Sequence, residues 1–434
     1  MPARSCIAIA AALASAALVA CSGELARVLD PATPREQHAE TLRGAGLAGT
    51  VLFRRWEEAG ERAVGAAPLL ETPFEESGYL VPERPDARGF RFAVRRGQRV
   101  VASFSLEGVD AGPLFADLYL LQDSAPPRHI ESADSGATTL ETEIRRDGVV
   151  VLRLQPALLA GGRYRVRLHL SPALGFPVGG AAQDAIRSRF GASRDAGRRS
   201  HEGIDIFAPR GTPVLAAARG TATWVGENRL GGTVIMIRDA LRGEGHYYAH
   251  LDTQLVREGE PVEQGDTIGL VGNTGNARTT PPHLHFGIYQ RGAVDPWPYV
   301  AAPDSVPEPV GVPPRSFGGW IRTGGRGAPL GRAPGAEPVR MLEPRTVARA
   351  LGGNAAWYRV RLPDGTEGYL PAARTEELAP LGRVPAASVL RERPDSAGVV
   401  VAVAGAGKRE EVVGRFGAFD LVRLDGEATA WLVR

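Results

Sequence analysis

The chain has 434 residues, of which 43% are hydrophobic and 23% are charged, and its formal net charge is +2. This length is too great for one ordinary hydrophobic core and predicts about three domains. The composition is that of a folded protein and not of a disordered chain. The arginines alternate with apolar residues and form no basic patch, which argues against a nucleic-acid partner.

An uncharged apolar run lies near the start of the chain, in "MPARSCIAIAAALASAALVACSGE". The run covers residues 6–20, is short for a membrane span and predicts a secretory signal peptide over residues 1–20. It ends in "LVAC", which resembles the lipobox of bacterial lipoproteins. That resemblance implies that Cys21 is acylated, becomes the first residue of the mature chain and anchors it to a membrane through several acyl chains. The alternative is an ordinary signal peptide that is cut near Ala20.

Cys6 and Cys21 are the only cysteines of the chain. Because the first is removed with the signal peptide and the second carries lipid, the mature chain has no disulfide and no thiolate metal ligand. Ser22 follows the lipobox cysteine, where aspartate favours inner-membrane retention in enterobacterial lipoproteins. The resemblance therefore implies an exported protein that is anchored in the cell envelope, in the outer membrane facing the periplasm.

Period-two patterning begins after a mixed stretch, residues 21–50, which is expected to be a tether. In "GRYRVRLHL", residues 162–170, apolar side chains alternate with polar ones, which predicts an antiparallel strand with one solvent-exposed face. Similar runs recur over residues 51–172 and predict a β-sandwich. The predicted fold class is therefore mostly β and multidomain, beginning with this sandwich.

Five of the eight histidines lie in the next segment, residues 176–300. His201 and Asp205 are four residues apart in "SHEGIDIF", and His283 and His285 lie on one face of a predicted strand in "PPHLHFGIY". Imidazole nitrogens and carboxylate oxygens are donors that zinc accepts. Taken alone, an HxxxD pair is more often coincidence than a metal site, and an HxH pair on a strand is often polar surface.

The strand that carries the HxH pair also predicts part of the core. Because side chains alternate along a strand, Leu284 and Phe286 are expected to pack on the face opposite the two histidines. The HExxH signature of a zinc-binding helix is absent, since "HEGID" lacks the second histidine. Any metal ligands must therefore come from strands and loops.

The histidine motifs occur in a fixed order, with "GGTVIMI" and "YYAHLDTQLVREGEPVEQGDTIGLVGNTGNA" between them. In this order they resemble the lysostaphin-type zinc endopeptidases of the LytM family, which implies a central antiparallel β-sheet metallopeptidase domain over residues 176–300. The resemblance implies one Zn2+ per chain, held by His201, Asp205 and His285. It implies two catalytic histidines, His250 of "YAHL" and His283, and leaves open which of them is the general base.

Two features depart from the family pattern. Gly287 follows "HLHF" where many relatives have glutamate, and no tyrosine precedes the first ligand in "GAAQDAIRSRFGASRDAGRRS". Both positions lie outside the implied zinc ligands. A further histidine, His246, has the same strand parity as His250 but is outside the family motif, so we expect it to be exposed at the surface.

The remainder of the chain begins with a proline-dense stretch, "AAPDSVPEPVGVPPR", which predicts a stiff extended linker over residues 301–315. Beyond it, "WYRVRLPDGTEGYLP" and "FDLVRLDGEATAWLV" repeat one apolar pattern around a turn and predict a hairpin each. Residues 316–376 and residues 377–434 resemble two small bacterial SH3-like barrels. Such modules often bind cell-wall peptides, and a purely structural tail is the alternative.

Together these features predict a lipid-anchored zinc metalloendopeptidase that hydrolyses peptide cross-links of peptidoglycan. Its partners would be peptidoglycan peptide stems and, through Cys21, a membrane. An outer-membrane lipoprotein would meet D-alanyl–diaminopimelate cross-links, which makes this bond the favoured one. The alternatives are a non-catalytic activator of cell-wall amidases and a wall-binding scaffold. The presence of every implied ligand and both implied catalytic histidines favours the enzyme.

Overall fold

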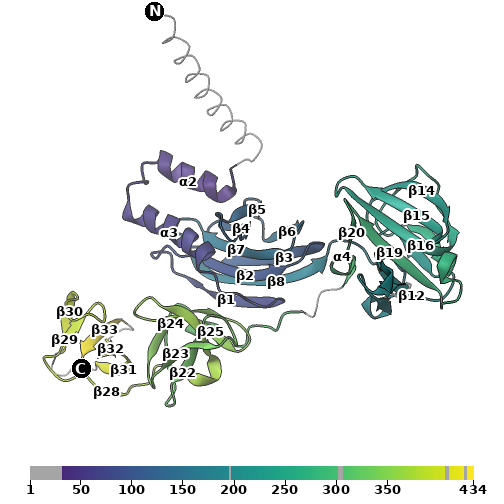
Figure 1. Cartoon of the computed structure of the whole chain (residues 1–434). Helices are drawn as coiled ribbons and strands as arrows, with labels where there is room; N and C mark the ends of the chain where they lie inside the picture. Colours follow the sequence, from purple (N-terminus) through teal and green to yellow (C-terminus); the bar gives the residue numbers. More distant parts are fainter. Residues whose placement is uncertain (1–31, 195–196, 302–305, 406–409, 425–427) are drawn as a thin grey trace, which may run out of the picture.

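The computed structural model describes residues 32–194, 197–301, 306–405, 410–424 and 428–434. The predicted signal peptide and Cys21 lie outside the described residues. The described chain is mostly β and folds into several sheets, as predicted (Figure 1). None of the helices in this described part has the length and apolar character that a membrane span requires.

Two helices precede the first sheet, α2 (Pro34–Gly44) and α3 (Val51–Gly65). Each begins after a threonine whose hydroxyl accepts a hydrogen bond from a backbone amide of the first turn. At α2, Thr33 and Glu36 form a reciprocal capping box. These local signals are visible in the sequence, and they stabilise helices where none was expected.

The expectation of a tether over residues 21–50 is therefore wrong from Pro34 onward, and the sandwich does not begin at residue 51. Helix α3 is held against the sheet by its apolar face. Trp56 is almost completely buried, and its indole nitrogen donates to the carbonyl oxygen of Pro156 at 2.8 Å. The helices thus cover one end of the sandwich instead of leading loosely into it (Figure 1).

The sandwich consists of two antiparallel sheets. One contains β1 (Phe74–Leu80), β8 (Gly162–Pro172), β3 (Gln98–Glu107) and β6 (Thr139–Glu143). The other contains β2 (Arg88–Val94), β7 (Gly148–Pro156), β4 (Leu114–Leu120) and β5 (Arg128–Ser132). The alternation predicted for β8 is confirmed, because Tyr164, Val166 and Leu168 are fully buried in a core to which both sheets contribute.

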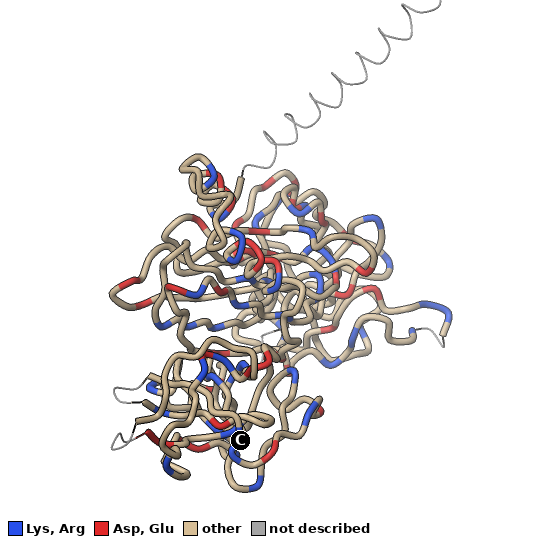
Figure 2. The backbone as a smooth tube through the Cα atoms, turned by 90° about the vertical axis from the view of Figure 1, so that its left-hand side faces the viewer, with Lys and Arg blue, Asp and Glu red and all other residues tan. Residues whose placement is uncertain are grey.

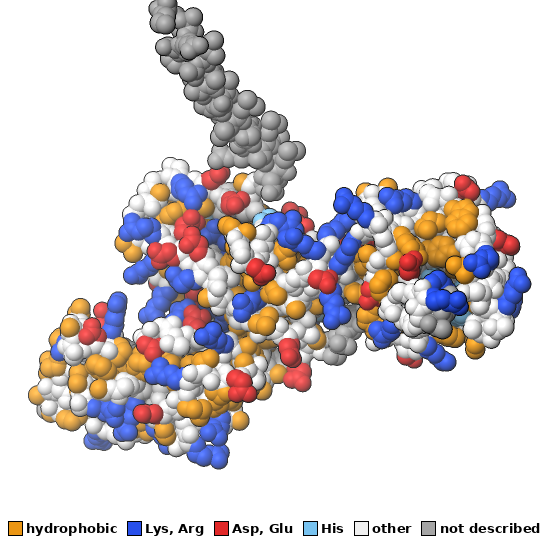
Figure 3. All heavy atoms as spheres, viewed as in Figure 1, with side chains coloured by type: hydrophobic (Ala, Val, Ile, Leu, Met, Phe, Trp, Pro, Cys, Tyr) orange, Lys and Arg blue, Asp and Glu red, His pale blue; other side chains and the backbone are white. Residues whose placement is uncertain are grey.

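The histidine-rich segment forms a separate lobe beside the sandwich (Figure 3). Its sheet has the order β17-β14-β15-β16-β19-β12-β9. The bounds of these strands are Pro261–Val262, Gly220–Asn228, Gly232–Asp239, Glu244–Gln254, His283–Tyr289, Ile204–Phe207 and Ile186–Ser188. Shorter elements complete the lobe: β10 (Ser193–Arg194), β11 (Arg199–Ser200), β13 (Pro213–Leu215), β18 (Thr267–Val271), β20 (Ala293–Val294) and α4 (Trp297–Val300).

Beyond this lobe the chain returns to the sandwich. Its next strands are β21 (Trp320–Thr323), β22 (Ala328–Gly331), β23 (Pro338–Leu342), β24 (Val347–Gly353), β25 (Trp357–Arg361), β26 (Glu367–Pro371) and β27 (Thr375–Glu376). β24 pairs with β1, so these strands extend one sheet of the sandwich. The last strands form a sheet of their own: β28 (Gly382–Arg383), β29 (Val389–Arg391), β30 (Val400–Val403), β31 (Glu411–Phe416), β32 (Phe419–Arg423) and β33 (Thr429–Val433).

Both predicted hairpins form, as β25–β26 and β32–β33. The likeness of the two regions to SH3 barrels stays a prediction. The first region, residues 316–376, does not form a separate domain, because its sheet is continuous with a sheet of the sandwich. Acidic and basic positions are interspersed along the described chain, in keeping with the small net charge (Figure 2).

Candidate metal centre and catalytic cavity

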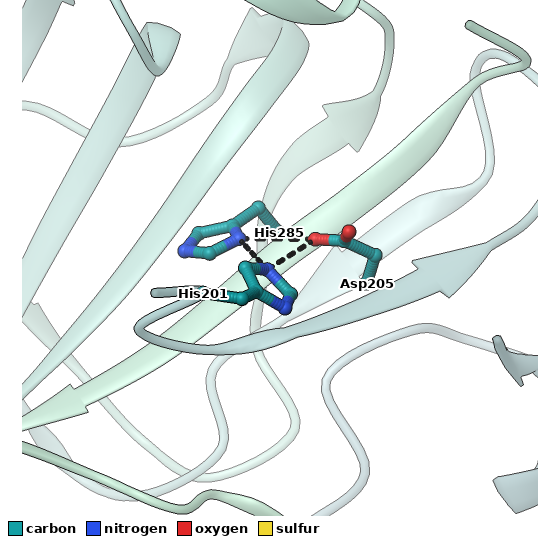
Figure 4. A group of neighbouring side chains, drawn as sticks. All are labelled: His201, Asp205 and His285. Atoms are coloured by element: carbon teal, nitrogen blue, oxygen red, sulfur yellow. Dashed lines mark hydrogen bonds and ion pairs between the residues drawn. The ribbon is translucent and has the colours of Figure 1, made fainter. Parts of the chain in front are cut away.

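Three side chains from β12, β19 and the loop before β12 meet on one face of the sheet (Figure 4). The antiparallel register of β12 and β19 puts Asp205 directly opposite His285. Nε2 of His201 lies 3.0 Å from Oδ1 of Asp205 and 2.9 Å from Nδ1 of His285. Nδ1 of His285 lies 3.0 Å from the same carboxylate oxygen. The structure therefore brings the three predicted ligands together.

The donor chemistry and the spacing of these atoms fit a metal ion. Nδ1 of His201 donates to the carbonyl oxygen of Arg189 at 2.9 Å, so in the neutral ring Nε2 directs a lone pair toward Asp205. Lone pairs of neutral imidazole and carboxylate repel one another at this range unless a proton or a metal ion lies between them. Ligand atoms of a tetrahedral zinc ion lie about 3.3 Å apart, close to the separations found here. The group can hold one metal ion.

The electrostatic surroundings keep Asp205 ionised and favour the neutral ring of His285. Burial raises the pKa of Asp205, but the two imidazoles beside it outweigh burial and hold that pKa well below its usual range. Burial lowers the pKa of His285, which favours the neutral ring. The second oxygen of Asp205 accepts a hydrogen bond from Arg194 at 2.7 Å, and the same guanidinium nitrogen donates to Ser188 at 2.5 Å. Arg194 thus holds the carboxylate through the oxygen that does not face the two histidines.

The two predicted catalytic histidines lie beside the ligand group. The ring centroids of His250 and His283 are 5.0 Å apart, and His250 lies 5.9 Å from His285. Nδ1 of His250 donates to the carbonyl of Thr274, and Nδ1 of His283 donates to the carbonyl of Pro281, both at 2.9 Å. Each ring therefore keeps Nε2 available for proton transfer. Burial, followed by the charges of the neighbouring histidines, lowers the pKa of His250 to about 4.

His250 reaches this cavity because the backbone breaks the alternation of β16. Its φ angle is 64°, in the left-handed region that residues other than glycine rarely adopt. The expectation that His246 shares its face and is exposed is therefore wrong. His246 is completely buried, its ring centroid lies 6.2 Å from that of Phe286, and its Nε2 lies 3.5 Å from Glu244. Side chains alternate between the two faces of the sheet along β16 up to Ala249, and the alternation ends at His250.

The predicted division of β19 into two faces is confirmed. Leu284 and Phe286 are fully buried in the core of the lobe. The two histidines of the same strand line a cavity of about 1030 Å³ on the other side of the sheet. The wall of this cavity contains all five predicted site residues: His201, Asp205, His250, His283 and His285.

The cavity wall also explains one departure from the family pattern and contains residues that the sequence reasoning missed. A Cβ atom at Gly287 would lie 3.0 Å from the ring of Tyr289, so that tyrosine occupies the space of a side chain at 287. Arg194, Asn228 and Tyr247 line the cavity and were not predicted. Strand parity gave no usable signal for Tyr247, because counting from His250 it points to Tyr248, which is fully buried.

An antiparallel sheet that carries two imidazoles, one carboxylate and two further histidines in one cavity has the donor set of a metallohydrolase. We call His201, Asp205 and His285 the metal-ligand group. Residues 199–296 match the model of Peptidase family M23, so the lobe that holds this group is a peptidase M23 domain.

Curated relatives each match less than a third of the chain. An L-Ala--D-Glu endopeptidase of Bacillus subtilis (strain 168) is 39% identical over 140 residues, which are 29% of this chain and 43% of that protein. The uncharacterized lipoprotein YgeR of Escherichia coli (strain K12) is 41% identical over 25% of this chain and 42% of its own length. The peptidoglycan DD-endopeptidase ShyC of Vibrio cholerae is 40% identical over 22% of this chain and 21% of its own. The chain thus spans less than half the length of each of these relatives.

Proposed function

We propose that this chain is a zinc metalloendopeptidase that hydrolyses peptide bonds in peptidoglycan. The observation that carries the proposal is the convergence of two imidazoles and one carboxylate in a cavity that also contains His250 and His283. The match to Peptidase family M23 and the names of the peptidoglycan endopeptidases among the relatives support the same activity.

His201, Asp205 and His285 would hold the zinc ion. Bound zinc with two neutral ligands and one carboxylate keeps a net positive charge, which lowers the pKa of water toward about 7 and polarises the scissile carbonyl. His250 and His283 each present Nε2 to the cavity because a backbone carbonyl holds Nδ1. One of them accepts the proton of the attacking water, and the other donates a proton to the leaving amine or binds the developing oxyanion.

The bond that we propose is the D-alanyl–diaminopimelate cross-link. It fits an exported lipoprotein that faces peptidoglycan in the periplasm, and one relative is named a peptidoglycan DD-endopeptidase. Another relative is named an L-Ala--D-Glu endopeptidase, which makes the bond between the first two residues of the stem peptide the competing choice.

Digestion of purified sacculi separates these possibilities. The zinc-loaded mature protein is incubated with sacculi, with and without a chelator, and the released muropeptides are analysed by mass spectrometry. Loss of cross-linked dimers with new D-alanine carboxyl ends supports the proposed bond, and shortened stems with intact cross-links support the competing one. Unchanged muropeptides with zinc present would overturn the enzymatic proposal and favour the activator of cell-wall amidases.

We also propose that Cys21 carries the lipid anchor and that the protein lies in the outer membrane, facing the periplasm. The lipobox-like "LVAC" supports this, and one relative is named a lipoprotein. Cys21→Ser in the full chain, expressed with a radiolabelled fatty acid, should lose the label and leave the membrane fraction. A labelled or membrane-bound Cys21→Ser protein would contradict the anchor.

A further inference from the structure

A tyrosine hydroxyl with no acceptor of its own lies in the wall of the catalytic cavity. Tyr247 is on β16, two residues before Ala249, and Ala249 pairs directly with His285 across the strands. The Tyr247 ring therefore lies on the same face of the sheet as the metal-ligand group. Its centroid is 6.1 Å from that of His285, with the two rings edge to face.

Asn228 determines how the Tyr247 hydroxyl is used. One side-chain atom of Asn228 receives hydrogen bonds from the backbone amides of Leu230 and Gly231, at 3.0 Å and 2.6 Å. Because backbone amides only donate, this atom is the oxygen Oδ1. The amide nitrogen Nδ2 then faces the hydroxyl oxygen of Tyr247 at 2.9 Å. An NH2 group also only donates, so the Tyr247 oxygen is the acceptor of this bond.

The hydrogen of the Tyr247 hydroxyl is consequently left to point elsewhere. In the described part of the chain it has no acceptor, since the bond from Asn228 is the one hydrogen bond of this hydroxyl. The oxygen lies over Gly231, where a Cβ atom would come within 2.2 Å of it. Asn228, Gly231 and Tyr247 all line the cavity. The free direction for the hydrogen is therefore the cavity.

A neighbouring tyrosine behaves in the opposite way. Tyr289 packs edge to face against Tyr247, with centroids 6.2 Å apart, but its hydroxyl donates to the carboxylate of Glu202 at 3.4 Å. Its hydrogen is thus already used. The two tyrosines differ in whether the hydroxyl partner is a donor or an acceptor, and only Tyr247 keeps a hydrogen for a ligand.

We propose that Tyr247 is a catalytic residue that donates this hydrogen bond to the oxygen of the scissile carbonyl. The proposal rests on the proposed peptidase function. As the water oxygen bonds to the carbonyl carbon, the carbonyl π electrons move onto the carbonyl oxygen and a proton passes from water to a cavity histidine. Tyr247 keeps its own proton and stabilises the oxygen that gains negative charge. A donor that is fixed before the reaction begins is suited to this task.

The test uses Tyr247→Phe and Asn228→Asp in the zinc-loaded full chain. The first removes the hydroxyl. The second keeps an oxygen for the backbone amides of Leu230 and Gly231 but replaces the donor NH2 by an acceptor, which captures the Tyr247 hydrogen. We expect each variant to lower kcat by about 100-fold, with KM changed by less than about threefold. The double variant should be no slower than either single variant, because both remove the same hydrogen bond.

The kinetics are measured on the purified muropeptide that the wild type cleaves, and zinc affinity is measured by chelator competition. Zinc affinity should stay at the wild-type value in every variant, and the matched control Tyr289→Phe should keep wild-type kcat. Wild-type kcat in Tyr247→Phe, or a rise in KM alone, overturns the catalytic assignment. A wild type that leaves every muropeptide intact overturns the peptidase function itself, and the inference with it.

Discussion

Two groups of buried polar side chains occupy different lobes of this molecule, and they satisfy their hydrogen-bonding atoms in opposite ways. The first, which we call the junction group, lies where β1 meets β24 and β25. The Glu76 carboxylate accepts hydrogen bonds from Tyr164 at 2.6 Å and from Tyr369 at 2.9 Å, and it lies 3.3 Å from the guanidinium of Arg359. The carboxylate is thus paired with donors and a positive charge on all sides.

The second group is the set of five site residues in the cavity of the M23 domain. Nε2 of His201, Oδ1 of Asp205 and Nδ1 of His285 converge on one point in the cavity. With a neutral His201 ring, the lone pairs of His201 and Asp205 face one another. Arg194 pairs with one oxygen of Asp205, and the other oxygen, which His201 and His285 share, faces a cavity that gives a cation or ligand access to it. Burial and polarity are common to both groups. What distinguishes a site from a structural ion pair here is that the ligand atoms of His201, Asp205 and His285 converge on one point and face a cavity.

The largest expected effect comes from removing the carboxylate of the metal-ligand group. Asp205→Ala should lose zinc and lower peptidase activity by at least about 1000-fold, because the zinc ion contributes several kcal/mol to transition-state stabilisation. Elemental analysis and muropeptide release measure the two effects. Asp252→Ala, which removes a partly exposed carboxylate outside the group, should match the wild type. Full zinc occupancy in Asp205→Ala would contradict the assignment.

Removing a predicted catalytic histidine should separate metal binding from turnover. His283→Ala and His250→Ala should each keep zinc and lower kcat by about 100- to 10,000-fold, since neither ring belongs to the metal-ligand group. Chelator competition and muropeptide kinetics report the two properties. His169→Ala on the sandwich serves as the control and should be unaffected. Loss of zinc from His283→Ala would move that residue into the ligand set.

The junction group should affect stability without affecting chemistry. Glu76→Ala leaves Arg359 buried without its carboxylate and should lower the unfolding free energy by about 3–5 kcal/mol, as measured by urea unfolding. The activity of the folded protein should remain at the wild-type level. Glu141→Ala, an exposed position on β6, should change the unfolding free energy by less than about 0.5 kcal/mol. A large loss of activity in folded Glu76→Ala would contradict the purely structural role of the junction group.

A smaller effect should appear at acid pH, at a second ion pair between the sandwich and β25. Burial raises the pKa of Asp86, but Arg88 and Arg361 more than offset this and lower it from 3.8 to about 2. Because the folded-state pKa is depressed, Asp86 contributes about 2 kcal/mol that is fully present above about pH 4 and is lost as the pH falls through 2. The difference in unfolding free energy between wild type and Asp86→Asn should therefore shrink between pH 4 and pH 2. A constant difference would contradict this.

Local patterns in the sequence accounted for much of the site. The period of two along β19 placed His283 and His285 on one face and two core residues on the other, because alternation depends only on consecutive residues. The same reasoning failed for His246, since it cannot detect the positive φ angle of His250. The capping box at Thr33 was also readable from the sequence, and the helix that follows it was missed.

The sequence by itself therefore determined the mostly β class, the faces of the regular strands and which three residues to expect as a metal-ligand cluster. Only the tertiary structure decided which distant atoms meet. The continuation of the sandwich sheet through β1 and β24, the burial of His246 and the donation from Asn228 to Tyr247 all depend on cross-strand register and backbone irregularities. Packing over the whole chain sets these features, and no short stretch of sequence records them.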